Sequence, residues 1–112
     1  MYDSGRLGAA LIERVWQQAR AMAEFDPGDW RQDQCGAWIR RDQYDNAASE
    51  FGWRVLDVVP DHPDEPDTLR AFHILNTFDV ARGQPVCRTR ADRRNIAAGT
   101  AAAEPHNEKV AD

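Results

Sequence analysis

Three prolines stand within seven residues of the chain, at Pro60, Pro63 and Pro66. Because proline fixes φ and lacks an amide hydrogen, neither a helix nor a central strand can run through this segment. The prolines therefore separate two predicted elements. The element before them, residues 53–59 (WRVLDVV), is short and rich in β-branched side chains, which predicts a strand that ends at Pro60.

Apolar residues recur at helical spacing in two other segments. Residues 5–25 predict an amphipathic helix that ends at residues 26–28 (DPG). Residues 67–82 (DTLRAFHILNTFDVAR) predict a second helix, ended by Gly83 and Pro85. The apolar face of the first helix can cover a small sheet or can bind a partner, and the pattern leaves both interpretations open.

A tight turn and a short strand are predicted for residues 35–40 (CGAWIR), where Gly36 can take the positive φ of such a turn. Together these elements predict an α+β fold. In it, an N-terminal amphipathic helix packs on a small antiparallel β-hairpin that is followed by a helix. We expect residues 1–84 to form this domain. Residues 85–112, first rich in arginine and then in alanine, are expected to be a flexible, disordered tail.

Composition excludes several functions. The 112-residue chain has a formal net charge of −5, so its bulk charge does not favour non-specific binding to nucleic acid. No apolar run approaches the length of about 18 residues that a membrane span needs, and the N-terminus does not resemble a signal peptide. Cys35 and Cys87 suggest no disulfide framework, so we expect two reduced thiols in a cytoplasmic protein.

The proline segment is also acidic. From Asp57 to Asp67 there are five carboxylates and no lysine or arginine. Clustered oxygen ligands can bind a hard cation, but their spacing does not fit an EF-hand. A solvated, proline-stiffened loop explains the same residues, and the sequence predicts no cofactor.

Several short motifs follow one another in a fixed order through the centre of the chain, and each occurs once. CGAWIRR occupies residues 35–41, Tyr-Asp-Asn follows at residues 44–46, Gly-Trp at residues 52–53, and later come His73 and Asn76. Over residues 10–80 this order resembles a bacterial branch of the HNH endonuclease family. The resemblance implies a ββα-metal fold, in which a metal stabilises the departing oxygen of a phosphodiester and a strand histidine activates water.

The residues that carry this chemistry in the family are replaced here. By the resemblance, Leu56 and Asp57 stand where the family has Asp-His, while Thr68 and Thr77 replace two asparagines. The resemblance therefore implies no catalytic residue, and these four are degenerate positions of an inactive, HNH-like pseudoenzyme. The remaining weak metal candidates are Asp57, His62 and His73, although the sequence offers too few ligands for a closed zinc site and favours a buried, hydrogen-bonded His73.

We expect an inactive domain that acts as a binding module, with no membrane partner. Its partner is not identified by the sequence, and both a protein and a nucleic acid remain open. Binding to DNA would use a set of basic side chains: Arg40, Arg41, His73, Arg82, Arg88 and Arg90. The alternative is a residual metal-dependent nuclease.

Overall fold

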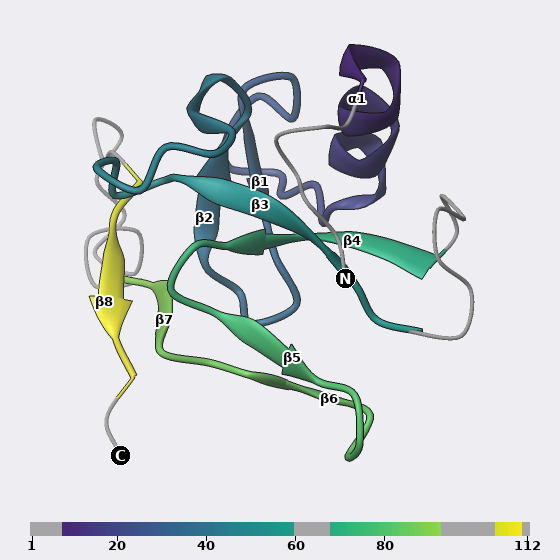
Figure 1. The fold of residues 1–112 in the computed structure, drawn as a ribbon. Helices are drawn as coiled ribbons and strands as arrows, with labels where there is room; N and C mark the ends of the chain where they lie inside the picture. The colour runs from purple at the N-terminus through teal and green to yellow at the C-terminus, as the bar shows by residue number, and fades with distance from the viewer. Residues whose placement is uncertain (1–7, 60–67, 93–104, 111–112) are drawn as a thin grey trace.

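The computed structural model describes residues 8–59, 68–92 and 105–110. These residues contain one α-helix, a short 3-10 helix and eight short strands (Figure 1). The elements are α1 (Ala9–Gln18), β1 (Trp30–Gln32), β2 (Trp38–Arg40), η2 (Arg41–Gln43), β3 (Trp53–Asp57), β4 (Leu69–His73), β5 (Thr77–Asp79), β6 (Gln84–Val86), β7 (Thr89–Ala91) and β8 (Asn107–Lys109).

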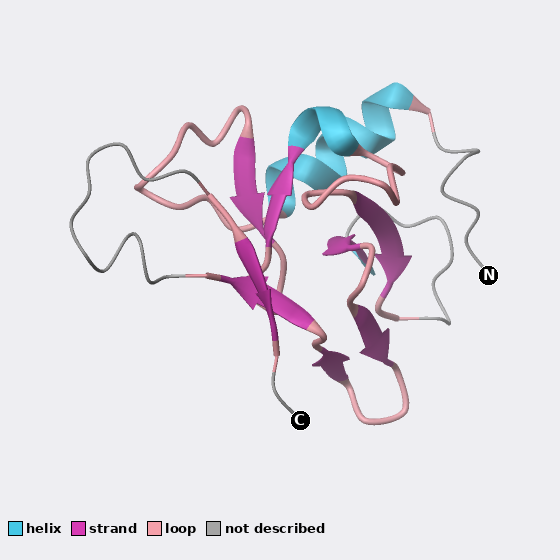
Figure 2. Ribbon diagram, turned by 90° about the vertical axis from the view of Figure 1, so that its left-hand side faces the viewer, coloured by secondary structure: helices cyan, strands magenta, loops and turns pink. Residues whose placement is uncertain are grey.

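The strands form four separate antiparallel pairs, β1–β2, β3–β4, β5–β6 and β7–β8. The helix α1 packs against β4 at one end of the molecule, and the β5–β6 hairpin extends at the opposite end (Figure 1). A view turned by 90° again places the helix at one end of the fold, with most strands below it (Figure 2). The expected α+β arrangement of helix, hairpin and helix is therefore wrong, because the described residues are mostly β.

The second helix, expected over residues 67–82, is where this prediction fails. Leu69–His73 is the strand β4, and Thr77–Asp79 is the strand β5. The strand β3 forms as expected, although it ends at Asp57 rather than Val59. The backbone N–H and C=O groups of β3 need hydrogen-bond partners. Because β4 pairs with all five residues of β3, from Trp53 opposite His73 to Asp57 opposite Leu69, tertiary pairing outweighs the helical spacing of the apolar residues.

The N-terminal helix is shorter than the expected range of residues 5–25. It ends at Gln18, and Arg20 already forms a two-way backbone pair with Gln32, with N–O distances of 3.0 and 2.9 Å. Arg20 thus pairs with the last residue of β1, which also pairs with β2, and this pairing excludes a helical conformation at residue 20. Of the two interpretations of the apolar face, covering the sheet agrees with the packing of α1 on β4.

A tryptophan-rich core lies between α1 and the β3–β4 pair. Trp16 and Trp53 are almost fully buried and their ring centroids lie 5.3 Å apart. The Trp53 indole N–H donates to the Arg40 carbonyl oxygen at 2.9 Å, which satisfies its polar end. The buried residues of this cluster are Val15, Trp16, Ile39, Trp53, Val55, Leu69 and Ala71.

Two glycines permit the turns that bring these elements together. Gly36 has a φ of 79° in the turn between β1 and β2, as the sequence predicts. Gly52 directly precedes β3 and lies against the backbone at Asn46, where a Cβ atom on residue 52 would stand 1.9 Å from the Asn46 carbonyl oxygen. Glycine is therefore needed at residue 52 for close approach of two backbone segments.

Cys35 and Cys87 form a disulfide, so the expected pair of reduced thiols is wrong. Cys35 lies in the β1–β2 turn and Cys87 lies between β6 and β7, with 5.5 Å between their Cα atoms. The two cysteines stand 52 positions apart in the chain, so no local motif signals this pairing.

The C-terminal part is packed on the domain where it is described. The expected boundary between residues 84 and 85 falls inside β6, and β8 pairs with β7 in register. The amide of Asn107 donates from Nδ2 to the Trp38 carbonyl oxygen and accepts from the Trp38 N–H, at 2.9 and 2.7 Å. The expected disordered tail is therefore wrong for residues 85–92 and 105–110, and residues 93–104 and 111–112 lie outside the described ones.

Candidate functional site

Asp33, His73 and Asn76 are buried and meet in one hydrogen-bond network. One carboxylate oxygen of Asp33 accepts the backbone N–H groups of Cys35 and Ala37, each at 2.9 Å. The other oxygen accepts the His73 backbone N–H and the Asn76 side-chain amide, also at 2.9 Å. Both Asp33 oxygens are thus occupied by the framework, and they hold the turn after β1 against the end of β4.

His73, a candidate for both binding and metal ligation, is only 3% exposed. Its Nε2 lies 2.6 Å from the Glu50 carbonyl oxygen, and its Nδ1 accepts the Leu75 N–H at 3.0 Å. A neutral ring with its proton on Nε2 satisfies both contacts. Because both ring nitrogens are engaged, the imidazole has no free nitrogen for a metal or for proton transfer, and the hydrogen-bonded interpretation is the one that agrees with the geometry.

Asn76 is fully buried and uses its whole side chain in the same way. Its Nδ2 donates to Asp33 and to the Thr89 carbonyl oxygen, while its Oδ1 accepts the N–H groups of Arg88 and Thr89 at 2.7 and 3.0 Å. It therefore joins the end of β4 to the start of β7.

The degenerate positions do not converge on one point. Asp57 is the last residue of β3, and its carboxylate accepts the Val59 N–H at 2.9 Å. Opposite Asp57 lies Leu69, four residues before His73 on β4, so Asp57 and His73 are separated by about 13 Å along the strands. Ligands of one metal lie within about 2–2.5 Å of it, so these two side chains cannot share an ion.

The other degenerate positions and His62 also fail to complete such a site. Leu56 lies opposite Arg70 in the β3–β4 pair, Thr68 precedes β4, and Thr77 begins β5 with an exposed side chain. His62 and most of the acidic loop lie outside the described residues. Within the described part of the chain, no three His, Cys, Asp or Glu side chains are placed to hold a metal ion.

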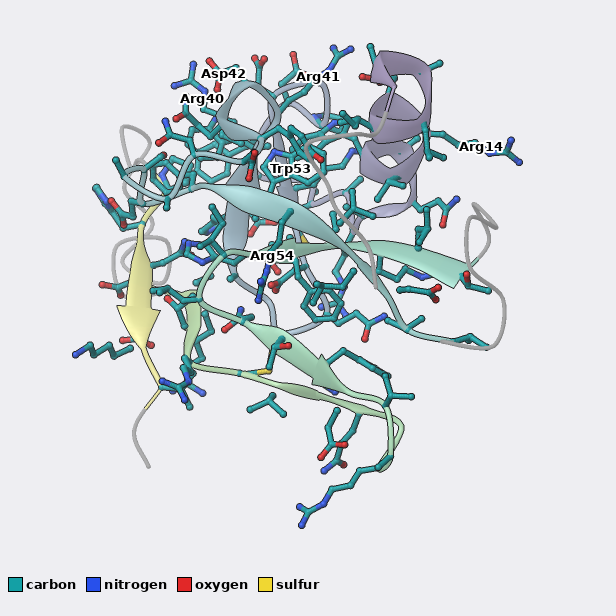
Figure 3. All side chains as sticks on the ribbon, in the orientation of Figure 1. Arg14, Arg40, Arg41, Asp42, Trp53 and Arg54 are labelled. Atoms are coloured by element: carbon teal, nitrogen blue, oxygen red, sulfur yellow. A yellow bond between two sulfur atoms is a disulfide. The ribbon has the colours of Figure 1, made fainter. Side chains whose placement is uncertain are left out.

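The expected basic residues do not form one surface. Arg40 and Arg41 lie beside Asp42 at the end of the molecule that carries α1 (Figure 3). Arg82 belongs to the turn of the β5–β6 hairpin at the opposite end (Figure 1). Arg40 and Arg41 are therefore separated from Arg82 by the length of the fold.

Most of these arginines also have an acidic neighbour. The ion pairs are Arg40–Asp42 at 3.4 Å, Arg41–Glu13, Arg82–Asp79 at 3.7 Å and Arg90–Glu108 at 3.4 Å. Arg88 has no side-chain partner among the described residues. The pKa of the Glu13 carboxyl lies below its ordinary value, mainly because the Gln17 side chain donates a hydrogen bond to it and also because Arg41 lies beside it. Burial acts in the opposite direction but is outweighed, so Glu13 is ionised at neutral pH.

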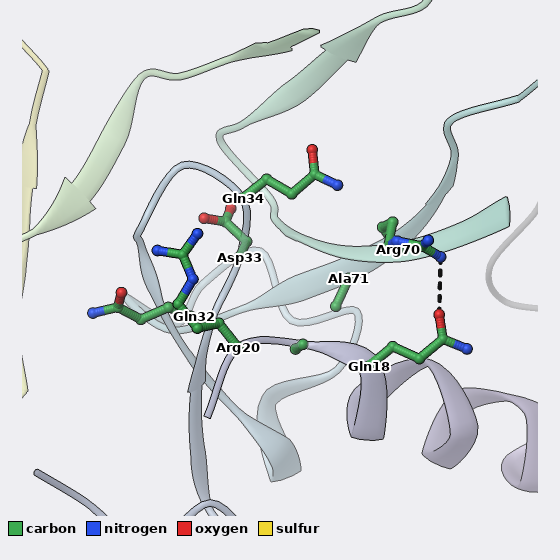
Figure 4. A pocket seen from close by; sticks show the side chains of 8 residues that line it. Gln18, Arg20, Gln32, Asp33, Gln34, Arg70 and Ala71 are labelled. Carbon is green, nitrogen blue, oxygen red and sulfur yellow. Dashed lines mark hydrogen bonds between the residues drawn. The ribbon is translucent and has the colours of Figure 1, made fainter. Parts of the chain in front are cut away.

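Hydrogen-bond donors gather instead in a pocket of about 180 Å³ beside the end of α1. Three segments build it: the end of α1 with the residues after it, the end of β1 with the turn that follows, and β4. Arg20 and Arg70 stand on opposite sides of the pocket, with Asp33 and Gln34 between them (Figure 4). The lining residues are Gln18, Ala19, Arg20, Gln32, Asp33, Gln34, Arg70 and Ala71.

Two donors of this pocket lack a protein acceptor. Gln32 is 4% exposed, and its Nε2 has no hydrogen-bond partner. The exposed Arg20 guanidinium has no ion pair or hydrogen bond to any described side chain. Arg70 is held in place, because its Nη1 donates to Gln18 Oε1 at 2.9 Å and to the Leu69 carbonyl oxygen at 2.8 Å.

The sequence did not predict this pocket. Arg20 and Arg70 both fall inside segments that the sequence predicts to be helical, and Gln32 falls outside every predicted element. No local motif marks these residues, because the pocket exists only where three distant segments meet.

A second pocket, of about 280 Å³, lies between the loop before β3 and β8, and His73 and Asn107 are among its lining residues. Both side chains are already engaged with the backbone, so this pocket offers less free hydrogen-bonding capacity than the first one.

Comparison with models of protein families, with curated proteins and with solved structures finds no match. None of the helices in the described ranges is long and apolar enough to cross a membrane.

Proposed function

We propose that this chain is a non-catalytic domain that binds a protein partner. One observation carries the proposal. His73 and Asn76, two polar residues of the motifs that carry the HNH resemblance, use all their side-chain hydrogen-bonding groups to hold the fold. From the HNH resemblance the proposal keeps only the loss of the catalytic residues.

A protein partner is preferred to a nucleic acid because of the charge distribution. The chain is acidic overall, and four of the five expected arginines already face a carboxylate. Binding to a phosphate backbone requires uncompensated positive charge along one surface. The separation of Arg40 and Arg41 from Arg82 gives no such surface.

A nicking assay tests the absence of catalysis. Supercoiled plasmid is incubated with purified chain and Mg²⁺, Mn²⁺ or Zn²⁺, beside the variant Asp57→Ala. We expect no nicking above the protein-free control. Nicking by the wild type that is lost in Asp57→Ala would establish the residual nuclease instead and refute the proposal.

A binding assay separates the two classes of partner. Labelled duplex DNA is titrated with the chain at several salt concentrations, and we expect no affinity that falls with salt. Chemical cross-linking in cells can then supply a candidate partner, which must bind again as purified protein with a saturating isotherm. Salt-dependent duplex binding would assign the domain to nucleic acid.

The disulfide bears on where the domain acts. Disulfides persist in oxidising compartments and are reduced in the cytosol. The cytoplasmic location expected from the sequence therefore requires that the fold survives with Cys35 and Cys87 reduced. Thiol alkylation and mass spectrometry on protein taken directly from its cells measure the redox state, and a fully oxidised pair would argue against the cytoplasm.

A further inference from the structure

The pocket beside the end of α1 contains two hydrogen-bond donors that no acceptor of the described residues engages. Arg20 has no side-chain partner within the described ranges, and the Gln32 Nε2 is buried without one. An unsatisfied buried amide has lost its hydrogen bonds to water, and a bound acceptor would recover that loss. The groups that lack partners are thus donors, and the missing partner is an acceptor.

The size of the pocket limits what that partner can be. Its volume of about 180 Å³ lies below the roughly 300–1,000 Å³ of sites that enclose a drug-sized ligand. A water molecule occupies about 30 Å³ in the liquid, so the pocket holds one small polar group and a few waters. A nucleotide or another large ligand does not fit, whereas the end of a side chain or of a peptide does.

The charge of the lining selects among small acceptors. Arg20 and Arg70 carry two positive charges, and the Asp33 carboxylate carries one negative charge. The resulting charge of +1 suits a monoanion better than a phosphate dianion, which Asp33 repels. A guanidinium matches a carboxylate in geometry, since two parallel N–H donors meet two oxygens.

We propose that this pocket binds a single carboxylate presented by a peptide, either at its C-terminus or on an aspartate or glutamate side chain. The inference rests on the proposed protein-binding function and names the chemical group recognised at one site of it. In the complex, Arg20 pairs with the carboxylate at the mouth of the pocket, and the Gln32 amide donates to it from the buried side.

The test is an NMR titration of the full ¹⁵N-labelled chain, in which the Gln32 side-chain amide and the Arg20 Nε–H report on the pocket. The probes are acetyl-tetra-alanine with a free C-terminal carboxylate, the same peptide as its C-terminal amide, acetyl-Ala-Glu-Ala-amide, acetate and inorganic phosphate. We expect saturable shifts with at least one of the two carboxylate peptides and none with the neutral amide. The carboxylate peptide that binds more tightly identifies the source of the group.

Two variants and one control locate the site. Arg20→Gln removes the unpaired guanidinium and should lower the affinity for the carboxylate peptide at least tenfold. Gln32→Leu removes the buried donor and should lower the same affinity severalfold, while the chain still folds. Arg82→Gln makes the same charge change at the far end of the molecule, and its affinity should stay within twofold of the wild type.

Each of the following results would overturn the inference: equal shifts with the tetra-alanine amide, unchanged affinity in Arg20→Gln, or tighter binding of phosphate than of any carboxylate probe. Acetate that binds as tightly as the peptides would also overturn it, because the partner would then be a free acid. If no carboxylate binds and the plasmid and duplex assays are negative, the pocket assignment fails while the proposed binding function stands. Nicking that depends on Asp57 would remove the proposed function itself.

Discussion

Asp33 holds together segments that lie far apart in the chain, and its replacement tests the whole network. In Asp33→Asn, one side-chain oxygen remains and can still accept the N–H groups of Cys35 and Ala37. The new amide nitrogen then faces two other donors, the His73 backbone N–H and the Asn76 side-chain amide. Two buried hydrogen bonds are lost, and donors are placed against donors.

The expected loss of stability follows from these contacts. A hydrogen bond to a charged group contributes about 1.5–3 kcal/mol, and a buried donor left unpaired costs about 1–3 kcal/mol. Removing the buried charge offsets part of this loss, because the charge itself is costly to desolvate. We expect Asp33→Asn to lower the free energy of unfolding by about 2–4 kcal/mol, and Asp33→Ala, which leaves four donors unpaired, to lower it by at least as much.

Urea denaturation followed by tryptophan fluorescence measures the change, with the slope of the transition checked for constancy. The control is Asp42→Asn, an identical chemical change at a side chain that is 62% exposed and paired with Arg40. That change should alter the free energy of unfolding by no more than about 0.5–1 kcal/mol. Equal denaturation midpoints for Asp33→Asn and Asp42→Asn would refute the idea that Asp33 organises the fold.

Three further predictions concern the framework. Reduction of the Cys35–Cys87 disulfide should lower the free energy of unfolding by up to about 4 kcal/mol, since the bond closes a loop of 52 residues; denaturation with and without reductant measures it, and coincident curves would contradict it. Asn107→Ala removes the side-chain bonds to β2 and should increase amide hydrogen exchange in β8 more than in β3; uniform exchange would count against this attachment. Gly52→Ala places a Cβ against a backbone carbonyl and should cost at least about 1–3 kcal/mol, measured as a shift of the thermal midpoint, whereas Gly8→Ala, at a glycine with open space around it, is the control.

The local features that the sequence predicts correctly depend on few neighbours. Gly36 takes the positive φ that its turn requires, and residues 53–57 form a strand because side chains such as Trp53 and Val55 suit a pleated, half-buried surface. Val15 and Trp16 lie on the buried face of α1, as the helical spacing predicts. Each of these outcomes follows from the conformational preferences of a short segment.

Tertiary structure decided the conformation of residues 69–73. Their apolar spacing fits a helix, but β3 offers a row of unpaired N–H and C=O groups, and satisfying these outweighs a weak helical propensity. The same pairing places Asp57 and His73 at opposite ends of the β3–β4 pair. The metal site for which the linear sequence offers Asp57 and His73 is thereby excluded for these two residues.

The sequence by itself determined that a helix forms near the N-terminus, although not where it ends, together with the strand before the prolines and the turn at Gly36, because the causes of these features act over a few residues. Only the tertiary structure decided the Asp33 network, the disulfide and the donor-rich pocket. Each of these joins segments that lie far apart in the chain, and the contacts between them arise when the backbone hydrogen bonds and the tryptophan core are satisfied together.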